Sequence, residues 1–246
     1  TQHGGGFPHV TIYDNVIAQQ RLVMEHLGVR RIALVTGWSM GALQAYQWVI
    51  SFPDVVERLL PFCGSARCWP QNQVFLEGVR AALCADQNYN GGFYQAPPLA
   101  GLRAFGRVYA GWAYSPAFFR DALYRNLGFE TLESFLTFWE DDHVGWDANN
   151  LLLKLWTWQH ADPAAHPDFL GDLQAALGRI RARTIIMPCD TDRYFTLEEN
   201  RIEAAMIRGA ELRPFISPYG HCAGAPGRFP VETAFLEQAL RDLLAR

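Results

Sequence analysis

The sequence predicts an α/β protein with a mostly parallel sheet that is interrupted by a large helical insertion. Short apolar runs alternate with helical patterns in both the N-terminal and the C-terminal part of the chain, which is typical of parallel strands joined by helices. Between these two parts, helical segments follow one another with no convincing strand. The four expected strands lie at residues 31–36, 55–62, 183–188 and 211–217.

The N-terminal part begins with a helical pattern. Apolar residues recur at helical spacing before Gly28, which is typical of a helix end. The run at 31–36 is too uniformly apolar for a half-exposed strand, so we expect it to be buried in a sheet. Residues 37–41 then predict a turn, and the helix over 42–52 ends before Pro53.

The central part of the chain has a different character. Six of the eight tryptophans lie between residues 64 and 175, which favours a helical lid over a site, although an ordinary helical subdomain with an aromatic core would have the same pattern. We therefore predict an α/β core formed by residues 1-69 and 176-246, and a helical lid insertion at 70-175. A final amphipathic helix is expected from Val231 to Leu244.

Composition restricts the class of protein. The chain has 246 residues, of which 50% are hydrophobic and 19% charged, so it is not a disordered protein. A formal net charge of -4 gives no basic surface for nucleic acid, and no apolar run is long enough for a membrane span. Five cysteines without a CxxC pair favour reduced thiols, and the first residues do not resemble a secretory signal. These observations predict a cytoplasmic protein.

The strongest chemical signal is the motif Gly37-x-Ser39-x-Gly41 between an expected strand and an expected helix. A serine on such a sharp turn presents its hydroxyl above the sheet, and the flanking glycines let backbone approach closely. A structural strand-to-helix turn is the alternative interpretation. A nucleophilic serine also needs a base and a group that orients the base.

Two later loops supply the required base and acid. His221 follows the last expected strand, and either Asp190 or Asp192 follows the strand before it. Because the carboxyl ends of parallel strands share one edge of the sheet, these side chains can converge on Ser39. The order serine, aspartate, histidine is that of the α/β-hydrolase fold.

Other polar groups carry weaker signals. His160 and His166 lack a carboxylate at a useful spacing, and the acidic run before His143 is typical of a solvated helix face. We predict no metal site and no bound cofactor. His3 and the three glycines after it imitate the oxyanion loop of some esterases but lie too close to Ser39, which favours a flexible terminus.

The motifs together resemble the homoserine O-acetyltransferase-like branch of the α/β-hydrolase superfamily, which also contains esterases. The resemblance covers the chain from Phe7 to near its end. The residues that carry it are Phe7-Pro8, Thr11-Ile12 and Asp14, Gly37-x-Ser39-Met40-Gly41 with Gln44-Ala45, Asp147-Ala148-Asn149, Asp192-x-x-Phe195 and Gly220-His221.

The resemblance implies a role for each matching residue. Ser39 would be the nucleophile, His221 the general base and acid, and Asp192 its orienting partner, chosen over Asp190 because Phe195 fits the family pattern. The backbone N–H of Met40 would supply half of the oxyanion hole. Arg107 lies near the place where the acetyltransferases hold the substrate carboxylate.

Departures from the family pattern affect the expected substrate. The residue after the catalytic histidine is Cys222 instead of an acidic residue, Trp38 replaces a small glycine, and Ala42 replaces another glycine. We expect Trp38 to line a more apolar site, which favours a neutral ester over a zwitterionic amino acid. The predicted function is a serine hydrolase that cleaves small carboxylic esters through an acyl-enzyme.

Two alternatives remain open at this point. The first is an O-acyltransferase of the homoserine O-acetyltransferase type with acetyl-CoA as co-substrate, and the second is an inactive or truncated protein of the same fold. The resemblance implies a homodimer formed through the insertion. It also implies further strands before the first helix, so we expect an exposed apolar edge on the strand at 31–36.

Overall fold

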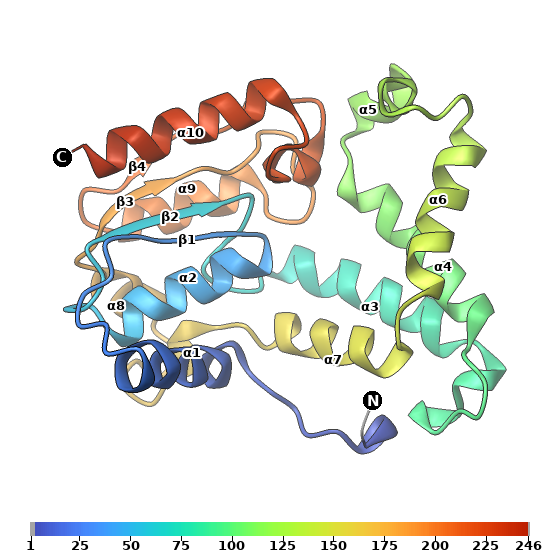
Figure 1. Cartoon of the computed structure of the whole chain (residues 1–246), viewed down its shortest axis with the longest axis horizontal. Helices are drawn as coiled ribbons and strands as arrows, with labels where there is room; N and C mark the ends of the chain where they lie inside the picture. Colours follow the sequence, from blue (N-terminus) through green and yellow to red (C-terminus); the bar gives the residue numbers. More distant parts are fainter. Residues whose placement is uncertain (1–2, 246) are drawn as a thin grey trace.

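A computed structural model describes residues 3–245 of the chain (Figure 1). Its four strands form one parallel sheet in the order β1-β2-β3-β4. This arrangement confirms the predicted α/β class, with a parallel sheet and a large helical insertion between β2 and β3. The strands span β1 (Val35–Trp38), β2 (Arg58–Phe62), β3 (Arg183–Ile186) and β4 (Glu211–Leu212).

Helices cover both faces of the sheet. One face packs against α10, and the other packs against α1, α2, α8 and α9. Successive side chains of β2 point in opposite directions, so that Leu59 joins the core under α2 while Leu60 joins the core under α10. The covering helices are α1 (Ile12–Gln20), α2 (Met40–Ser51), α8 (Leu173–Gly178), α9 (Leu197–Met206) and α10 (Pro230–Leu244).

The helical insertion projects beyond the carboxyl ends of the strands and forms the right-hand part of Figure 1. Its own core is rich in aromatic side chains, including Phe75, Phe118, Phe135 and Trp158. None of the helices in the described part of the chain is long and apolar enough to cross a membrane. The insertion contains α3 (Pro70–Cys84), α4 (Leu99–Ala113), α5 (Pro116–Arg120), α6 (Leu132–Val144) and α7 (Ala148–Gln159).

The first strand begins later than the sequence predicts. Residues 31–34 make only an isolated bridge, between Ile32 and Val56, whereas Gly37 and Trp38 belong to β1 instead of the turn. The reason is the register with β2, because Gly37 lies opposite Pro61 and Trp38 opposite Phe62. The strand therefore runs to the residue directly before Ser39.

The outer side of β1 is an exposed apolar edge, as expected. Within residues 3–245, β1 has a strand neighbour only on the β2 side. An open groove of about 490 Å³ lies along it and is lined by apolar side chains such as Val23, Ile32 and Val35. The N-terminal segment does not cover this edge, because His9 stacks on Trp156 of α7 instead.

The turn between β1 and α2 has a tightly constrained backbone. Ser39 adopts φ 59° and ψ −125°, a conformation that L-residues rarely occupy. A Cβ atom on Gly37 would lie 2.2 Å from the carbonyl oxygen of Gly41, so only glycine fits there. Gly64 is needed for a similar reason, because its Cβ atom would lie 2.2 Å from the Cβ atom of Ala42.

Gly37→Ala should distort this turn. We expect a loss of about 2–3 kcal/mol in the free energy of unfolding, because the new methyl group overlaps the backbone at Gly41. Gly41→Ala is the matched control, since a Cβ atom there has nothing within 4 Å. Urea unfolding of both variants checks the prediction, and equal stability of the two would contradict it.

A buried carboxylate joins α9 to the loop after β2. Glu203 is fully buried, and it accepts hydrogen bonds from the backbone N–H of Ala66 at 2.8 Å and from Nε1 of Trp69 at 2.7 Å. Burial raises the pKa of Glu203 from 4.5 to about 7. The folded protein therefore holds a proton on this group at a pH where the unfolded chain has released it.

This raised pKa predicts a pH dependence of stability. Between pH 4.5 and about 7 the folded state binds more protons than the unfolded state, so the contribution of Glu203 to stability decreases as the pH rises. We expect the stability of the wild type relative to Glu203→Gln to be greater at pH 5 than at pH 8 by roughly 2–3 kcal/mol.

Thermal or urea unfolding across this pH range measures the difference. Glu198→Gln changes an exposed carboxylate on the same helix and serves as the control. A stability difference between wild type and Glu203→Gln that does not vary with pH would contradict the prediction.

Candidate active site

Three side chains from distant parts of the sequence form a hydrogen-bonded chain at the carboxyl edge of the sheet. Nε2 of His221 lies 2.9 Å from the hydroxyl oxygen of Ser39, and Nδ1 of His221 lies 2.9 Å from Oδ2 of Asp192. Since a carboxylate only accepts, Nδ1 carries the ring proton and Nε2 is left to accept from the serine hydroxyl. His221 and Asp192 are buried, whereas Ser39 is partly exposed.

The aspartate is held by the loop in which it lies. Its second oxygen, Oδ1, accepts hydrogen bonds from the backbone N–H groups of Tyr194 at 2.7 Å and Phe195 at 3.2 Å. Asp190 is exposed and instead accepts from the backbone N–H of Ser217. The structure therefore places Asp192, and not Asp190, against the histidine.

Aromatic rings surround the imidazole of His221. The ring centroids of Tyr194, Phe195 and Trp38 lie 4.5, 5.6 and 5.3 Å from the centroid of the imidazole. Nε1 of Trp38 also donates to the carbonyl oxygen of His221 at 3.3 Å. Trp38 thus contacts the histidine itself, and its role in binding substrate remains a prediction.

The loop that carries His221 is anchored from two sides. Ser217 donates to a buried carboxylate oxygen of Glu232 on α10 at 2.6 Å, and the Ser115 hydroxyl of the insertion donates to the carbonyl of Pro218. Gly220 adopts φ +59°, and a Cβ atom there would lie 2.9 Å from the backbone nitrogen of Ser115. The loop and the insertion therefore fit closely together.

Met40 begins α2 directly after Ser39. The first N–H groups of a helix have no partner within the helix, and they lie at the positive end of its dipole. This position is compatible with the predicted oxyanion role of the Met40 N–H, which remains a prediction.

Arg107 lies on α4 within an acidic cluster. Its guanidinium pairs with the carboxylates of Glu133 and Glu140 on α6, and its side chain is 39% exposed. Cys222, next to the histidine, is buried, and burial raises the pKa of its thiol to about 11. The position after His221 is therefore uncharged at neutral pH, and the positive charge of Arg107 is already neutralised.

Several residues of the site were not identified from the sequence. Tyr194 contacts the imidazole, Ser115 and Glu232 anchor its loop, and Gly64 allows the close approach to α2. Among these residues, only Tyr194 could have been suspected from the sequence, because it lies two positions after Asp192. The other contacts depend on how α5 and α10 pack, which no motif reveals.

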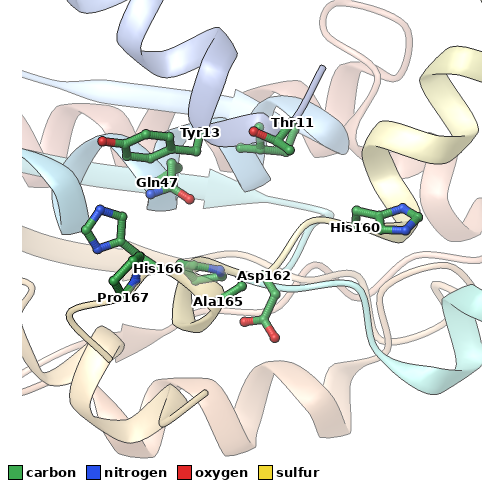
Figure 2. A pocket seen from close by; sticks show the side chains of 10 residues that line it. Thr11, Tyr13, Gln47, His160, Asp162, Ala165, His166 and Pro167 are labelled. Atoms are coloured by element: carbon green, nitrogen blue, oxygen red, sulfur yellow. The ribbon is translucent and has the colours of Figure 1, made fainter. Parts of the chain in front are cut away.

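Two pockets lie near these elements. A pocket of about 330 Å³, shown in Figure 2, is lined by Tyr13, Gln47, His160 and His166 and includes none of the three hydrogen-bonded residues. Another, of about 270 Å³, lies in the insertion and reaches Met40, and none of the three hydrogen-bonded residues lines it either. Within the described residues, no three His, Cys, Asp or Glu side chains converge as ligands for a metal.

Comparisons with known proteins identify the same family as the sequence motifs do. No protein-family model matches the chain. It is 37% identical to a probable esterase of Corynebacterium glutamicum, over 96% of this chain and 67% of the relative. It is also 37% identical to an ethyl acetate hydrolase of Pseudomonas veronii, over 96% of this chain and 66% of the relative. The chain thus spans about two thirds of the length of these relatives.

A solved structure and a transferase extend the comparison. An acetylester hydrolase from Corynebacterium glutamicum superposes with a TM-score of 0.94 at 34% identity, covering 99% of this chain and 70% of the other. A homoserine O-acetyltransferase of Pasteurella multocida is 32% identical over 99% of this chain and 69% of its own length. The chain belongs to the branch of the α/β-hydrolase superfamily that contains esterases and homoserine O-acyltransferases.

Proposed function

We propose that this protein is a serine hydrolase that cleaves esters of small carboxylic acids. The observation that carries the proposal is a continuous chain of hydrogen bonds. It runs from Ser39, at the turn before α2, through His221 to Asp192. A serine, a base and an orienting acid in this order are the machinery of acyl transfer through an acyl-enzyme.

The proposed reaction has two stages. His221 accepts the proton of the Ser39 hydroxyl as the serine oxygen attacks the ester carbonyl, and Asp192 stabilises the resulting imidazolium. The Met40 N–H faces the oxyanion, and His221 then returns the proton to the departing alcohol. In the second stage His221 activates water, which releases the acid and regenerates Ser39.

The uncharged surroundings support a neutral ester as substrate. Cys222 carries no charge at neutral pH, and Arg107 is paired with two carboxylates. A zwitterionic substrate would need charged partners for its ammonium and carboxylate groups. An ethyl acetate hydrolase and an acetylester hydrolase among the relatives also support short acyl groups.

Acyl transfer is the second candidate. The identity to a homoserine O-acetyltransferase supports it, and acetyl-CoA would then be the acyl donor in place of an ester. Both activities would use Ser39, His221 and Asp192 and differ in whether water or an alcohol attacks the acyl-enzyme. The third candidate, a protein of this fold without activity, is excluded if Ser39 forms an acyl-enzyme.

Three further expectations accompany the proposed activity. Residues 70-175 would act as a lid over the reacting atoms, with residues 1-69 and 176-246 as the core. The insertion would also supply the contact surface of a homodimer. We expect the protein to act in the cytoplasm.

Ser39→Ala should abolish turnover of p-nitrophenyl acetate, because it removes the nucleophile. Asp192→Asn should lower kcat by about 10⁴-fold, since the amide no longer holds the imidazole in the required tautomer. Asp190→Asn is the matched control, because this carboxylate lies two residues away and does not contact His221. Equal kcat values for the two asparagine variants would contradict the assignment of Asp192.

Added homoserine separates hydrolysis from transfer. For a hydrolase, the rate of p-nitrophenol release and the yield of free acetate should not change with homoserine concentration. Formation of O-acetylhomoserine, measured by mass spectrometry with either p-nitrophenyl acetate or acetyl-CoA as donor, would favour the transferase instead.

A further inference from the structure

The insertion contains a pocket of about 270 Å³ between α4, α6 and α7. Its lining includes six residues that are mostly apolar or aromatic. They are Met40, Tyr109, Trp139, His143, Leu151 and Trp158.

The inner wall of this pocket adjoins the reacting residues. Met40 directly follows Ser39 in the chain, and its side chain lines the pocket. Tyr109 and Trp158 both pack edge-on against Tyr194, with ring centroids 5.5 and 5.8 Å away. The Tyr194 ring in turn contacts His221. It therefore lies between the imidazole and the Tyr109 and Trp158 side chains of the pocket wall.

One wall of the pocket holds a buried imidazole. Nδ1 of His143 lies 2.8 Å from the carbonyl oxygen of Trp139, and a carbonyl only accepts, so Nδ1 carries the ring proton. Burial lowers the pKa of His143 and so favours the neutral ring, although the hydrogen bond to Trp139 and the charge of Asp142 act in the opposite direction. Nε2 is then a hydrogen-bond acceptor, and no described residue makes a hydrogen bond to it.

An acceptor in an apolar pocket favours a ligand that carries a donor. Two charged residues also line the pocket. Oδ2 of the exposed Asp142 lies 3.5 Å from Nδ1 of His143, on the side of the ring opposite Nε2, and Nζ of Lys154 lies 4.8 Å from the Trp146 ring centroid. A substituent that reached His143 would be surrounded by aromatic rings and would meet Nε2 as an acceptor. Two of the lining residues, Trp139 and Trp158, also have buried indole N–H groups without a hydrogen-bond partner among the described residues. A hydroxyl on a short carbon chain has this combination of properties.

We propose that this pocket is a subsite for a short uncharged substituent of the ester and that Nε2 of His143 accepts a hydrogen bond from a hydroxyl on it. This inference rests on the proposed ester hydrolysis and specifies its substrate class as hydroxylated short esters. The substituent belongs to either the acid or the alcohol part of the ester. Substrates that vary one part at a time distinguish these two possibilities.

The first experiment fills the pocket. Leu151→Trp places a large ring in it, whereas Leu152→Trp changes the next residue of α7, which lines a different pocket. We expect Leu151→Trp to lower kcat/KM for butyl acetate or p-nitrophenyl butyrate by about tenfold relative to p-nitrophenyl acetate. Equal effects of the two variants on this ratio would overturn the proposal.

The second experiment tests the acceptor. His143→Phe removes it, and His160→Phe is the control because Nδ1 of His160 makes the same contact to a carbonyl four residues earlier. Two substrate pairs exchange a methyl group for a hydroxyl: pentyl acetate with 4-hydroxybutyl acetate, and ethyl 3-methylbutyrate with ethyl 3-hydroxybutyrate.

We expect His143→Phe to reduce the preference for the hydroxylated ester about three- to tenfold in one of the two pairs. The affected pair identifies the acid or the alcohol part as the occupant. An unchanged preference in both pairs, or an equal change in His160→Phe, would overturn the role of His143.

A binding measurement separates this inference from the proposed activity. In Ser39→Ala protein, 4-hydroxybutyl acetate or ethyl 3-hydroxybutyrate should shift the indole N–H resonances of Trp139 and Trp158, and Leu151→Trp should abolish the shifts. Such shifts in Ser39→Ala, together with no ester turnover by the wild type, would support the subsite and reject the hydrolase. Turnover by the wild type without any such shift would support the hydrolase and reject the subsite.

Discussion

The hydrogen bond between Ser39 and His221 is the contact on which the arrangement of the rest of the molecule depends. It joins residues 182 positions apart and is 2.9 Å long. For the two residues to meet, β1 and the strands that precede the two later loops must end at the same edge of the sheet. It also requires the turn before α2 to hold Ser39 at a positive φ, which in turn requires Gly37 to have no side chain.

The insertion takes part in this arrangement. The guanidinium of Arg193, next to Asp192, donates to the carbonyl of Gly111 at 2.9 Å, and the Ser115 hydroxyl donates to the loop before His221. The buried side-chain amide of Asn72 on α3 donates to the carbonyl of Tyr194. Both loops that carry the acid and the base are therefore fixed to the insertion as well as to the sheet, so displacement of α4 would affect both of them.

Local sequence predicted those features that local physics determines. The strand-turn-helix unit around Ser39 follows from apolar runs and glycine spacing, and the loops of Asp192 and His221 follow from strand ends. The start of β1 was placed too early because its register depends on β2. Tyr194, Ser115 and Glu232 were missed because their contacts arise from tertiary packing, which gives no periodic signal in the sequence.

The distribution of charge supports the proposal that the site and the subsite take neutral ligands. A charge that enters a buried site is costly unless a partner and hydrogen bonds compensate it. Arg107, which is partly exposed, already has two carboxylate partners. Burial favours the uncharged form both of the Cys222 thiol beside His221 and of the His143 ring in the insertion. A substrate carboxylate that approached Arg107 would have to compete with Glu133 and Glu140, whereas a neutral ester needs no charged partner.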